Sequence, residues 1–116
     1  MSGQLIRTYK IEDGRPGVEE ARRLLMQEIK ASKSAGYRFL KLIHGFGSSG
    51  VGGDLRIALR KSLTKRRSEG MIRGFIPGEK WSPFSQEARD VVDRFPALGR
   101  DTDYARENPG ITIVEL

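Results

Sequence analysis

Five glycines lie within ten residues of this chain, in the stretch HGFGSSGVGG at 44–53. The stretch follows a mostly apolar run, FLKLI at 39–43, and precedes a segment at 55–68 whose apolar residues recur at helical spacing. Glycine lets a ligand approach the backbone closely, and a helix that begins after such a loop turns unpaired N–H groups toward it. The pattern predicts an anion site with phosphate as its usual occupant. A plain connecting loop is the alternative interpretation.

Two nucleotide-binding motifs can be compared with this loop. A P-loop needs Lys and Ser or Thr directly after its second glycine. Gly45 and Gly50 have the spacing of that motif, but Val51 follows, so the phosphate lysine and the magnesium hydroxyl are missing. The dinucleotide fingerprint fits Gly45, Gly47 and Gly50, but it follows the second predicted strand, and no acid lies at a strand end about twenty residues later. The stronger interpretation is a site for a polynucleotide backbone.

Positive charge is concentrated in the predicted helix after the loop. The chain has a formal net charge of +6, and residues 55–68 contain no acid. The basic residues of this segment are Arg56, Arg60, Lys61, Lys65, Arg66 and Arg67. At 100° per residue, Arg56, Arg60 and Arg67 fall within a stripe about 40° wide. We expect this stripe to be exposed, opposite the apolar residues of the helix, and to follow a phosphate backbone.

His44 is the only histidine, and it follows the apolar run at 39–43. Open α/β sheets bind ligands at the carboxyl ends of their parallel strands, and imidazole can act as an acid or a base near neutral pH. His44 is therefore a candidate catalytic residue, and support of the loop is the alternative role. One histidine and no cysteine exclude a His-rich or thiolate metal site, and no carboxylate cluster has obvious metal-ligand spacing.

The predicted elements alternate between strands and helices. Strands are expected at 5–11, 39–43, 71–76 and 111–116, and helices at 18–36 and 55–68. Residues 77–109 are expected to form an insert with one helix at 86–95, inside a single domain of residues 1–116. This order predicts a small α/β sheet with two main helices and a partly helical insert before the last strand. In the insert, Trp81 and Phe84 are candidate anchors for a protein partner, although burial in a small satellite core is favoured for both.

The sequence also limits where the protein can act. The chain contains no apolar run of the roughly 20 residues that a membrane helix needs. Residues 1–10 lack the apolar stretch of a signal peptide. We expect a cytoplasmic protein without membrane contact, whose oligomeric state the sequence does not predict.

The stretch LIHGFGSSGVGGDLR at 42–56 resembles the His-Gly-x-Gly signature of the Smr (small MutS-related) domain family. GITIVEL at 110–116 is similar to the final strand of that family, and VEEA at 18–21 is similar to the start of its first helix. The resemblance implies a βαβαββ fold similar to the C-terminal domain of translation initiation factor three. It also implies binding to branched or structured DNA or RNA, which several members nick as endonucleases.

The same resemblance assigns roles to residues and shows one departure. His44, Gly45 and Gly47 would form the signature loop, and Arg56 would be its trailing basic residue. The family's first motif, Leu-Asp-x-His-Gly, precedes the first helix, and its acid and histidine are tied to cleavage. Aligned without gaps, Glu12 takes the place of that acid and Gly14 the place of that histidine. Whether the domain cuts is therefore left open.

We expect a nucleic-acid-binding Smr-like domain with a phosphate-binding loop and a basic helix, and His44 and Glu12 are its candidate catalytic residues. Two alternatives stay open: a non-catalytic protein-interaction module and a mononucleotide-binding domain that uses the same loop. No cofactor is expected, and a divalent metal held by Glu12 or Asp13 is the alternative to acid–base catalysis by His44. The expected nucleic-acid contacts are Gly45, Gly47, Ser48, Ser49, Gly50, Arg56, Arg60, Lys61 and Arg67.

Overall fold

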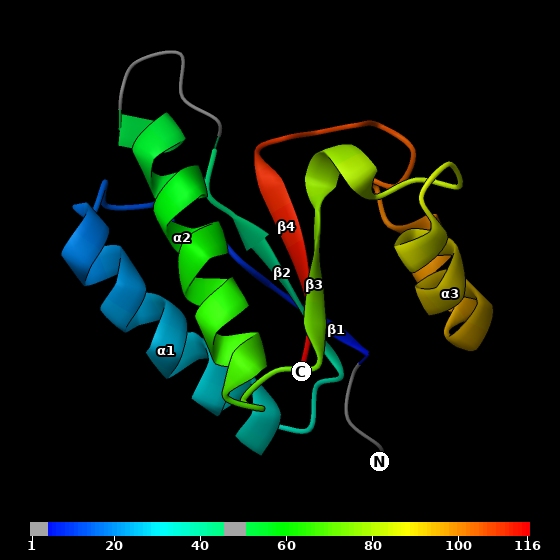
Figure 1. Ribbon diagram of the computed structural model, residues 1–116, viewed down its shortest axis with the longest axis horizontal. Coiled ribbons are helices and arrows are strands. Elements are labelled where there is room, and N and C mark those ends of the chain that lie inside the picture. The colour runs from blue at the N-terminus through cyan, green and yellow to red at the C-terminus, as the bar shows by residue number, and fades with distance from the viewer. Residues whose placement is uncertain (1–4, 46–50) are drawn as a thin grey trace.

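A four-stranded mixed sheet forms the centre of the protein (Figure 1). The structure is a computed structural model that describes residues 5–45 and 51–116, without the side chains of 51–54. The strands are β1 (Ile6–Tyr9), β2 (Phe39–Ile43), β3 (Gly74–Pro77) and β4 (Ile111–Glu115), and the helices are α1 (Val18–Ser34), α2 (Val51–Ser68) and α3 (Gln86–Arg94). The sheet has the order β1-β2-β4-β3. The predicted α/β class is therefore confirmed, with three helices and four strands described.

The sheet is mixed because of the direction of β4. β1 and β2 are parallel, whereas β4 runs antiparallel to both of its neighbours, β2 and β3. The strand β2 is mostly apolar, as is typical of a strand that is buried on both faces. It is central and its first four residues are buried, but only one of its neighbours is parallel.

Helix ends explain why one predicted strand is shorter than expected. The predicted strand at 71–76 begins only at Gly74, because the backbone of Met71 is hydrogen-bonded to the end of α2. The N–H of Met71 donates to Arg66 O and the N–H of Gly70 donates to Arg67 O, each at 3.0 Å. Gly70 has φ +77°, so these bonds form the glycine-terminated helix end that a left-handed residue allows.

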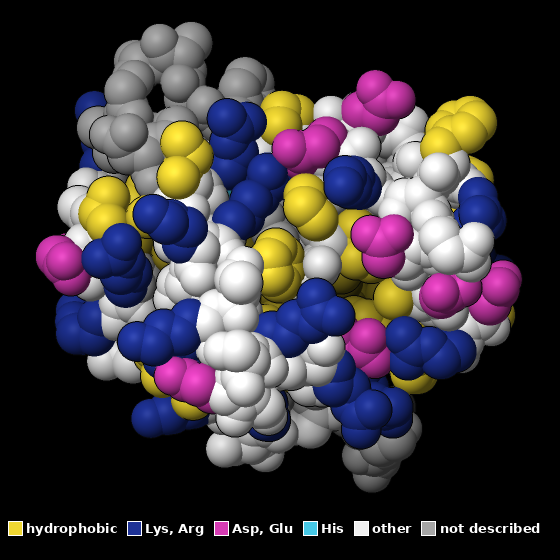
Figure 2. Space-filling view, in the orientation of Figure 1, with side chains coloured by type: hydrophobic (Ala, Val, Ile, Leu, Met, Phe, Trp, Pro, Cys, Tyr) yellow, Lys and Arg dark blue, Asp and Glu magenta, His cyan; other side chains and the backbone are white. Residues whose placement is uncertain are grey.

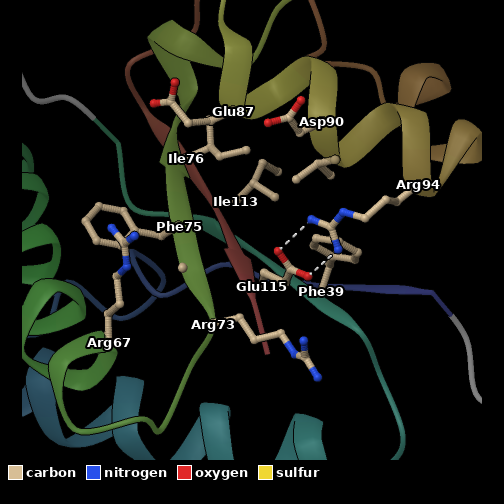
Figure 3. A pocket seen from close by; sticks show the side chains of 12 residues that line it. Phe39, Arg67, Arg73, Phe75, Ile76, Glu87, Asp90, Arg94, Ile113 and Glu115 are labelled. Atoms are coloured by element: carbon tan, nitrogen blue, oxygen red, sulfur yellow. Dashed lines mark hydrogen bonds and ion pairs between the residues drawn. The ribbon is translucent and has the colours of Figure 1, made fainter.

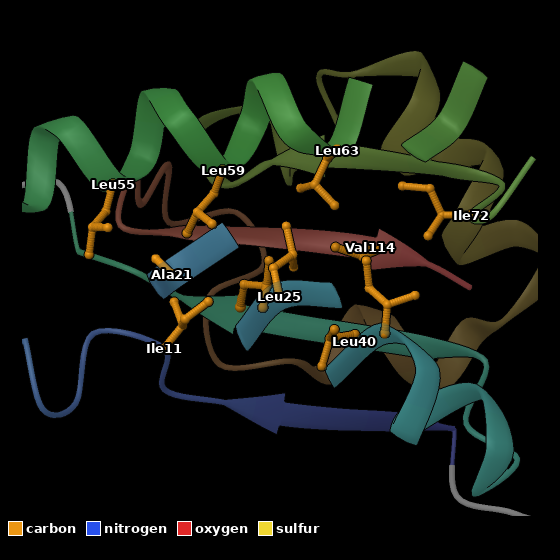
Figure 4. Packing of buried hydrophobic residues seen from close by; sticks show 11 residues of the cluster. Ile11, Ala21, Leu25, Leu40, Leu55, Leu59, Leu63, Ile72 and Val114 are labelled. Carbon is orange, nitrogen blue, oxygen red and sulfur yellow. The ribbon is translucent and has the colours of Figure 1, made fainter. Parts of the chain in front are cut away.

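Two hydrophobic cores lie on opposite faces of the sheet. Leu40 and Leu42 of β2 face a core formed with α1 and α2, where Leu55, Leu59 and Leu63 of α2 point toward the sheet (Figure 4). Phe39 of the same strand faces the second core, which is covered by the insert and α3. This division follows from the alternation of side chains along a strand.

The insert is fixed to the sheet by apolar and ionic contacts. Trp81 is fully buried in the second core, which confirms its expected core position, whereas the expected burial of Phe84 is wrong, because this residue is 90% exposed. The Lys41 side chain, only 6% exposed, forms ion pairs with Asp101 at 2.9 Å and with Asp103 at 2.6 Å. Burial alone would lower the pKa of Lys41, but the hydrogen bonds to Asp103 and Asp101 raise it overall. Within the described part of the chain, no helix is long and apolar enough to cross a membrane.

Candidate functional site

The candidate site lies at the edge of the sheet where the parallel strands β1 and β2 end and where α2 begins (Figure 1). After β1, Ile11 is buried and the chain turns at Glu12. The backbone N–H of Glu12 donates to Ile43 O at 3.3 Å, so the turn after β1 is held to the end of β2. Two segments far apart in the sequence therefore meet at this edge.

Glu12 and Gly45 lie next to each other. Gly45 has φ +74°, and a Cβ atom added to it would lie 2.9 Å from Glu12 Oε1. A side chain at this position would strain the backbone and would also displace the Glu12 carboxylate. The structure thus brings a predicted carboxylate beside the start of the predicted phosphate loop.

His44 is fixed at the same edge but is not accessible. Its side chain is 1% exposed. Nδ1 lies 2.7 Å from Gly45 O and Nε2 lies 2.8 Å from Thr112 Oγ1. Burial lowers the pKa of His44 to about 4, the hydrogen bond to Gly45 acts in the opposite direction, and the charges of Arg60 and Arg56 lower it further. The imidazole is therefore neutral at pH 7, with both ring nitrogens hydrogen-bonded.

The hydrogen bonds indicate one tautomer of His44. A carbonyl oxygen can only accept, so Nδ1 carries the proton and donates to Gly45 O. Thr112 then donates its hydroxyl proton to Nε2 and accepts from Arg60 Nε at 3.1 Å. The backbone adds to this anchoring, because the N–H groups of His44 and Gly45 both donate to Gly110 O at 3.0 Å.

Arg60 continues this set of hydrogen bonds to the insert. Its guanidinium donates to both carboxylate oxygens of Glu79, at 2.9 and 3.0 Å, and to Ile111 O at 3.2 Å. Burial acts to raise the pKa of Glu79, but hydrogen bonds, led by those from Arg60, lower it overall. Hydrogen bonds thus connect four side chains in series: Glu79, Arg60, Thr112 and His44.

The expectation of an exposed arginine stripe is wrong for Arg60. Its side chain is only 18% exposed, because the side of α2 that carries it packs against β4 and the start of the insert. Sequence analysis also missed Thr112 and Glu79. Thr112 had one signal, since it is a polar residue within the apolar strand ITIVEL and needs a buried partner. Glu79 had none.

The other predicted cations lie on different parts of α2. Arg56 is partly buried, and its charge lowers the pKa values of His44 and Glu79. Lys61 is exposed and faces a hollow beside α1. Arg67 is exposed and lines a different hollow of about 240 Å³ between β3 and α3 (Figure 3). The predicted contacts Gly47, Ser48, Ser49 and Gly50 lie outside the described residues.

The hollow beside α3 carries charges of both signs (Figure 3). Its charged residues are Arg67, Arg73, Arg94, Glu87, Asp90 and Glu115. Two of them neutralise each other, because Arg94 donates to both carboxylate oxygens of Glu115, at 2.9 and 3.1 Å. The hollow therefore has no preference for an anion.

Among the described residues, no group of three His, Asp or Glu side chains is placed to hold a metal ion. The arrangement instead combines a small, mixed α/β sheet with an edge where one carboxylate, one glycine with positive φ and basic side chains of α2 meet. This edge contains the described part of the stretch that resembles the Smr signature.

Comparisons with known proteins bear on that resemblance. No model of a protein family matches the chain, and no solved structure matches it. Endonuclease MutS2 of Aquifex aeolicus (strain VF5) is 40% identical over 62 residues, which are 53% of this chain and 8% of that enzyme. The chain thus spans a small part of the relative. The C-terminal region of MutS2 is an Smr domain, so the match supports an Smr-like domain and the predicted resemblance is confirmed.

Proposed function

We propose that this chain is a nucleic-acid-binding domain of the Smr type, with a βαβαββ fold similar to the C-terminal domain of translation initiation factor three. The binding site is the edge where β1 and β2 end and α2 begins. One observation carries this proposal: Glu12 lies against Gly45 at this edge, and the charge of Arg56 on α2 acts on the neighbouring His44. The similarity to an enzyme named an endonuclease supports it.

Phosphate is the group that this edge would bind. The N-terminus of α2 presents backbone N–H groups there, and helix N-termini favour anions. Arg56, in the second turn of α2, adds a charged donor that no described carboxylate pairs with. The loop residues Gly47, Ser48, Ser49 and Gly50 remain predicted contacts of the same phosphate.

The geometry favours a positioning role for His44. To accept a proton, its ring would have to give up the hydrogen bond from Thr112 and carry a charge in a buried place near Arg56 and Arg60. Glu12, in contrast, is exposed and lies against Gly45. We therefore propose that cleavage by this domain would use Glu12, with a divalent cation held jointly by its carboxylate and a substrate phosphate.

A panel of single-stranded, duplex and branched DNA and RNA tests this function in binding and cleavage assays. Wild-type protein should bind, and Arg56→Ala should lower the salt slope on duplex DNA by about 0.9, the contribution of one phosphate contact. Lys80→Ala, which removes an exposed charge from the insert, is the matched control. Binding to none of the substrates, or an affinity that does not depend on salt, would overturn the proposal.

If the protein cleaves any of these substrates, variants can distinguish the roles of the two candidate catalytic residues, Glu12 and His44. We expect Glu12→Gln and a chelator each to abolish it, while His44→Gln retains it at a reduced rate. Cleavage that persists in chelator but disappears in a folded His44→Gln protein would restore His44 as the acid or base.

A further inference from the structure

The groove between α1 and α2 contains a hollow of about 270 Å³ that is separate from the sheet edge. Both helices contribute to it, and the lining residues are Arg22, Lys61, Ser62, Lys65 and Arg66. Four of the five are cations, the fifth carries a hydroxyl group, and none of these described lining residues is acidic. The hollow therefore has a single sign of charge, unlike the hollow beside α3. Lys and Arg side chains gather over α1 and α2 on the face shown in Figure 2.

Helical spacing sets the four α2 residues of this hollow in two neighbouring rows. Lys61 and Lys65 are four positions apart, and so are Ser62 and Arg66. Residues four apart lie on one face of a helix, about one turn of 5.4 Å from each other. Arg22 adds a fifth donor from α1, so polar donors line the hollow from both helices.

Two of the four cations in this groove have no ion pair with any described residue, and the other two have ion pairs at 3.3 and 3.4 Å. The ammonium groups of Lys61 and Lys65 form no ion pair or hydrogen bond with any described residue. Arg22 pairs with Glu19 on its own helix, at 3.3 Å, and both side chains are exposed. Exposed pairs of this kind contribute at most about 1 kcal/mol and leave the arginine available to another anion.

Arg66 differs from the other three cations because one of its donors is buried without a hydrogen-bond partner among the described residues. Its side chain is 15% exposed, and Nη1 donates to the sulfur of Met26 at 3.1 Å, a weak acceptor. Nε is buried without a hydrogen-bond partner among the described residues, although Glu69 Oε1 lies 3.4 Å away. A partly desolvated guanidinium with unused donors gains more from an added anion than an exposed one does.

We propose that this groove binds a phosphate of a nucleic-acid backbone, so that a strand held at the sheet edge continues along α2. The inference rests on the proposed function and extends its binding site. Arg56 at the edge and Lys65 in the groove are nine residues apart on α2, which is a rise of about 14 Å along the helix axis and about half a turn around it, so the strand would cross the helix obliquely. The rise alone corresponds to about four nucleotides at 3.4 Å each, and the path around the helix adds to this number.

Lysine footprinting on the full chain tests the contact directly. The protein is acetylated with and without a 20-nucleotide DNA or RNA, and each lysine is quantified by mass spectrometry. We expect nucleic acid to protect Lys61 and Lys65 but not Lys80, which is exposed on the insert. A parallel sample with polyglutamate tests an acidic polypeptide as the occupant.

A pair of double variants measures the energetic contribution. Lys61→Gln with Lys65→Gln removes two charges from the groove, and Lys80→Gln with Arg100→Gln removes two exposed charges from the insert. All four side chains are exposed, and the midpoint of urea unfolding verifies that both proteins fold. We expect the groove pair to lower the salt slope on duplex DNA by about 1.8, as for two lost phosphate contacts, and the insert pair to leave it unchanged.

The outcomes distinguish this inference from the proposed function. Equal losses in both pairs would show that only net charge matters and would overturn the groove site. A normal slope in the groove pair would also overturn it, while the proposed function stands if Arg56→Ala still weakens binding. Protection by polyglutamate alone would assign the groove to an acidic polypeptide. Wild-type protein that binds no nucleic acid would overturn both proposals.

Discussion

At the scale of single residues, His44 and Gly45 show why two neighbours in one motif have different roles. The imidazole of His44 is buried, neutral and hydrogen-bonded at both nitrogens, so it fixes the end of β2. Gly45 is partly exposed, has positive φ and lies against Glu12. The histidine therefore orients the backbone of the motif, and the glycine leaves space for a carboxylate.

The buried His44 predicts a pH dependence of stability. Because its pKa is lowered from 6.5 to about 4, the folded protein binds a proton at His44 less readily than the unfolded chain does. The contribution of His44 is complete above pH 6.5 and is lost as the pH falls toward 4, by about 3 kcal/mol. Urea unfolding of wild type and His44→Gln between pH 7.5 and 4 measures it. A wild type and variant with parallel pH profiles would show that the imidazole titrates normally.

Gly45→Ala should affect both stability and binding. Its positive φ makes any side chain unfavourable by about 1 kcal/mol, and the new Cβ would displace Glu12. Gly70→Ala is the matched control, because Gly70 has φ +77° but no atom within 4 Å of an added Cβ. We expect similar losses in urea unfolding for both variants and weaker nucleic-acid binding only for Gly45→Ala. Equal binding by the two variants would count against a role of the Glu12–Gly45 contact.

At the scale of elements, two different sides of helix α2 have different roles. One side holds Arg60 against β4 and Glu79, and another presents Lys61 and Lys65 to the groove beside α1. Helical spacing predicted that Arg60 shares one stripe of the helix with Arg56 and Arg67. It could not predict that β4 and the insert cover the side that carries Arg60.

Arg60→Ala should therefore behave as a stability variant. It removes the partner of Glu79 and a donor to Thr112, and a polar group that loses its buried partner costs about 1–3 kcal/mol. Arg60→Lys should not restore stability, because lysine cannot donate to both carboxylate oxygens in the same fork. Arg56→Ala should leave the unfolding midpoint nearly unchanged. An Arg60→Ala protein of normal stability and weakened binding would return Arg60 to the phosphate surface.

At the scale of the whole molecule, the sheet separates a basic half from an insert that carries seven of the 15 acidic residues. Residues 55–68 hold six bases and no acid, and the insert provides the carboxylates that pair with Lys41 and Arg60. Such a distribution steers a polyanion to the α1–α2 side. Binding should strengthen with strand length, whereas a mononucleotide site would show the same affinity for short and long strands.

The contact between the insert and the sheet should matter for folding and not for binding. Lys41→Met leaves Asp101 and Asp103 partly buried without their cation, which costs about 3 kcal/mol or more. Adding Asp101→Asn and Asp103→Asn should recover part of that loss, because no unpaired charge remains. Urea unfolding measures the stability, and the salt slope should stay at the wild-type value. A changed slope in a folded variant would place part of the nucleic-acid surface on the insert.

Local sequence patterns by themselves determined the elements and their order. The bounds of β2 match the predicted run 39–43, α3 lies within the predicted helix at 86–95, and Trp81 is in the core as favoured. These features depend on periodicity, on turn residues and on the positions of apolar side chains. All three are properties of residues that are close together in the sequence.

Only the tertiary structure decided which residues meet. The placement of β4 between β2 and β3 brings Thr112 to His44 and Arg60, and the return of the insert brings Asp101 to Lys41. These partners are 52 to 68 positions apart in the chain. A buried polar group requires a partner, but its own sequence neighbourhood does not say which distant segment supplies it. For that reason the sequence predicted His44 as a candidate acid or base and Arg60 as part of an exposed stripe, whereas the structure shows a buried, neutral histidine near an arginine that is paired with Glu79.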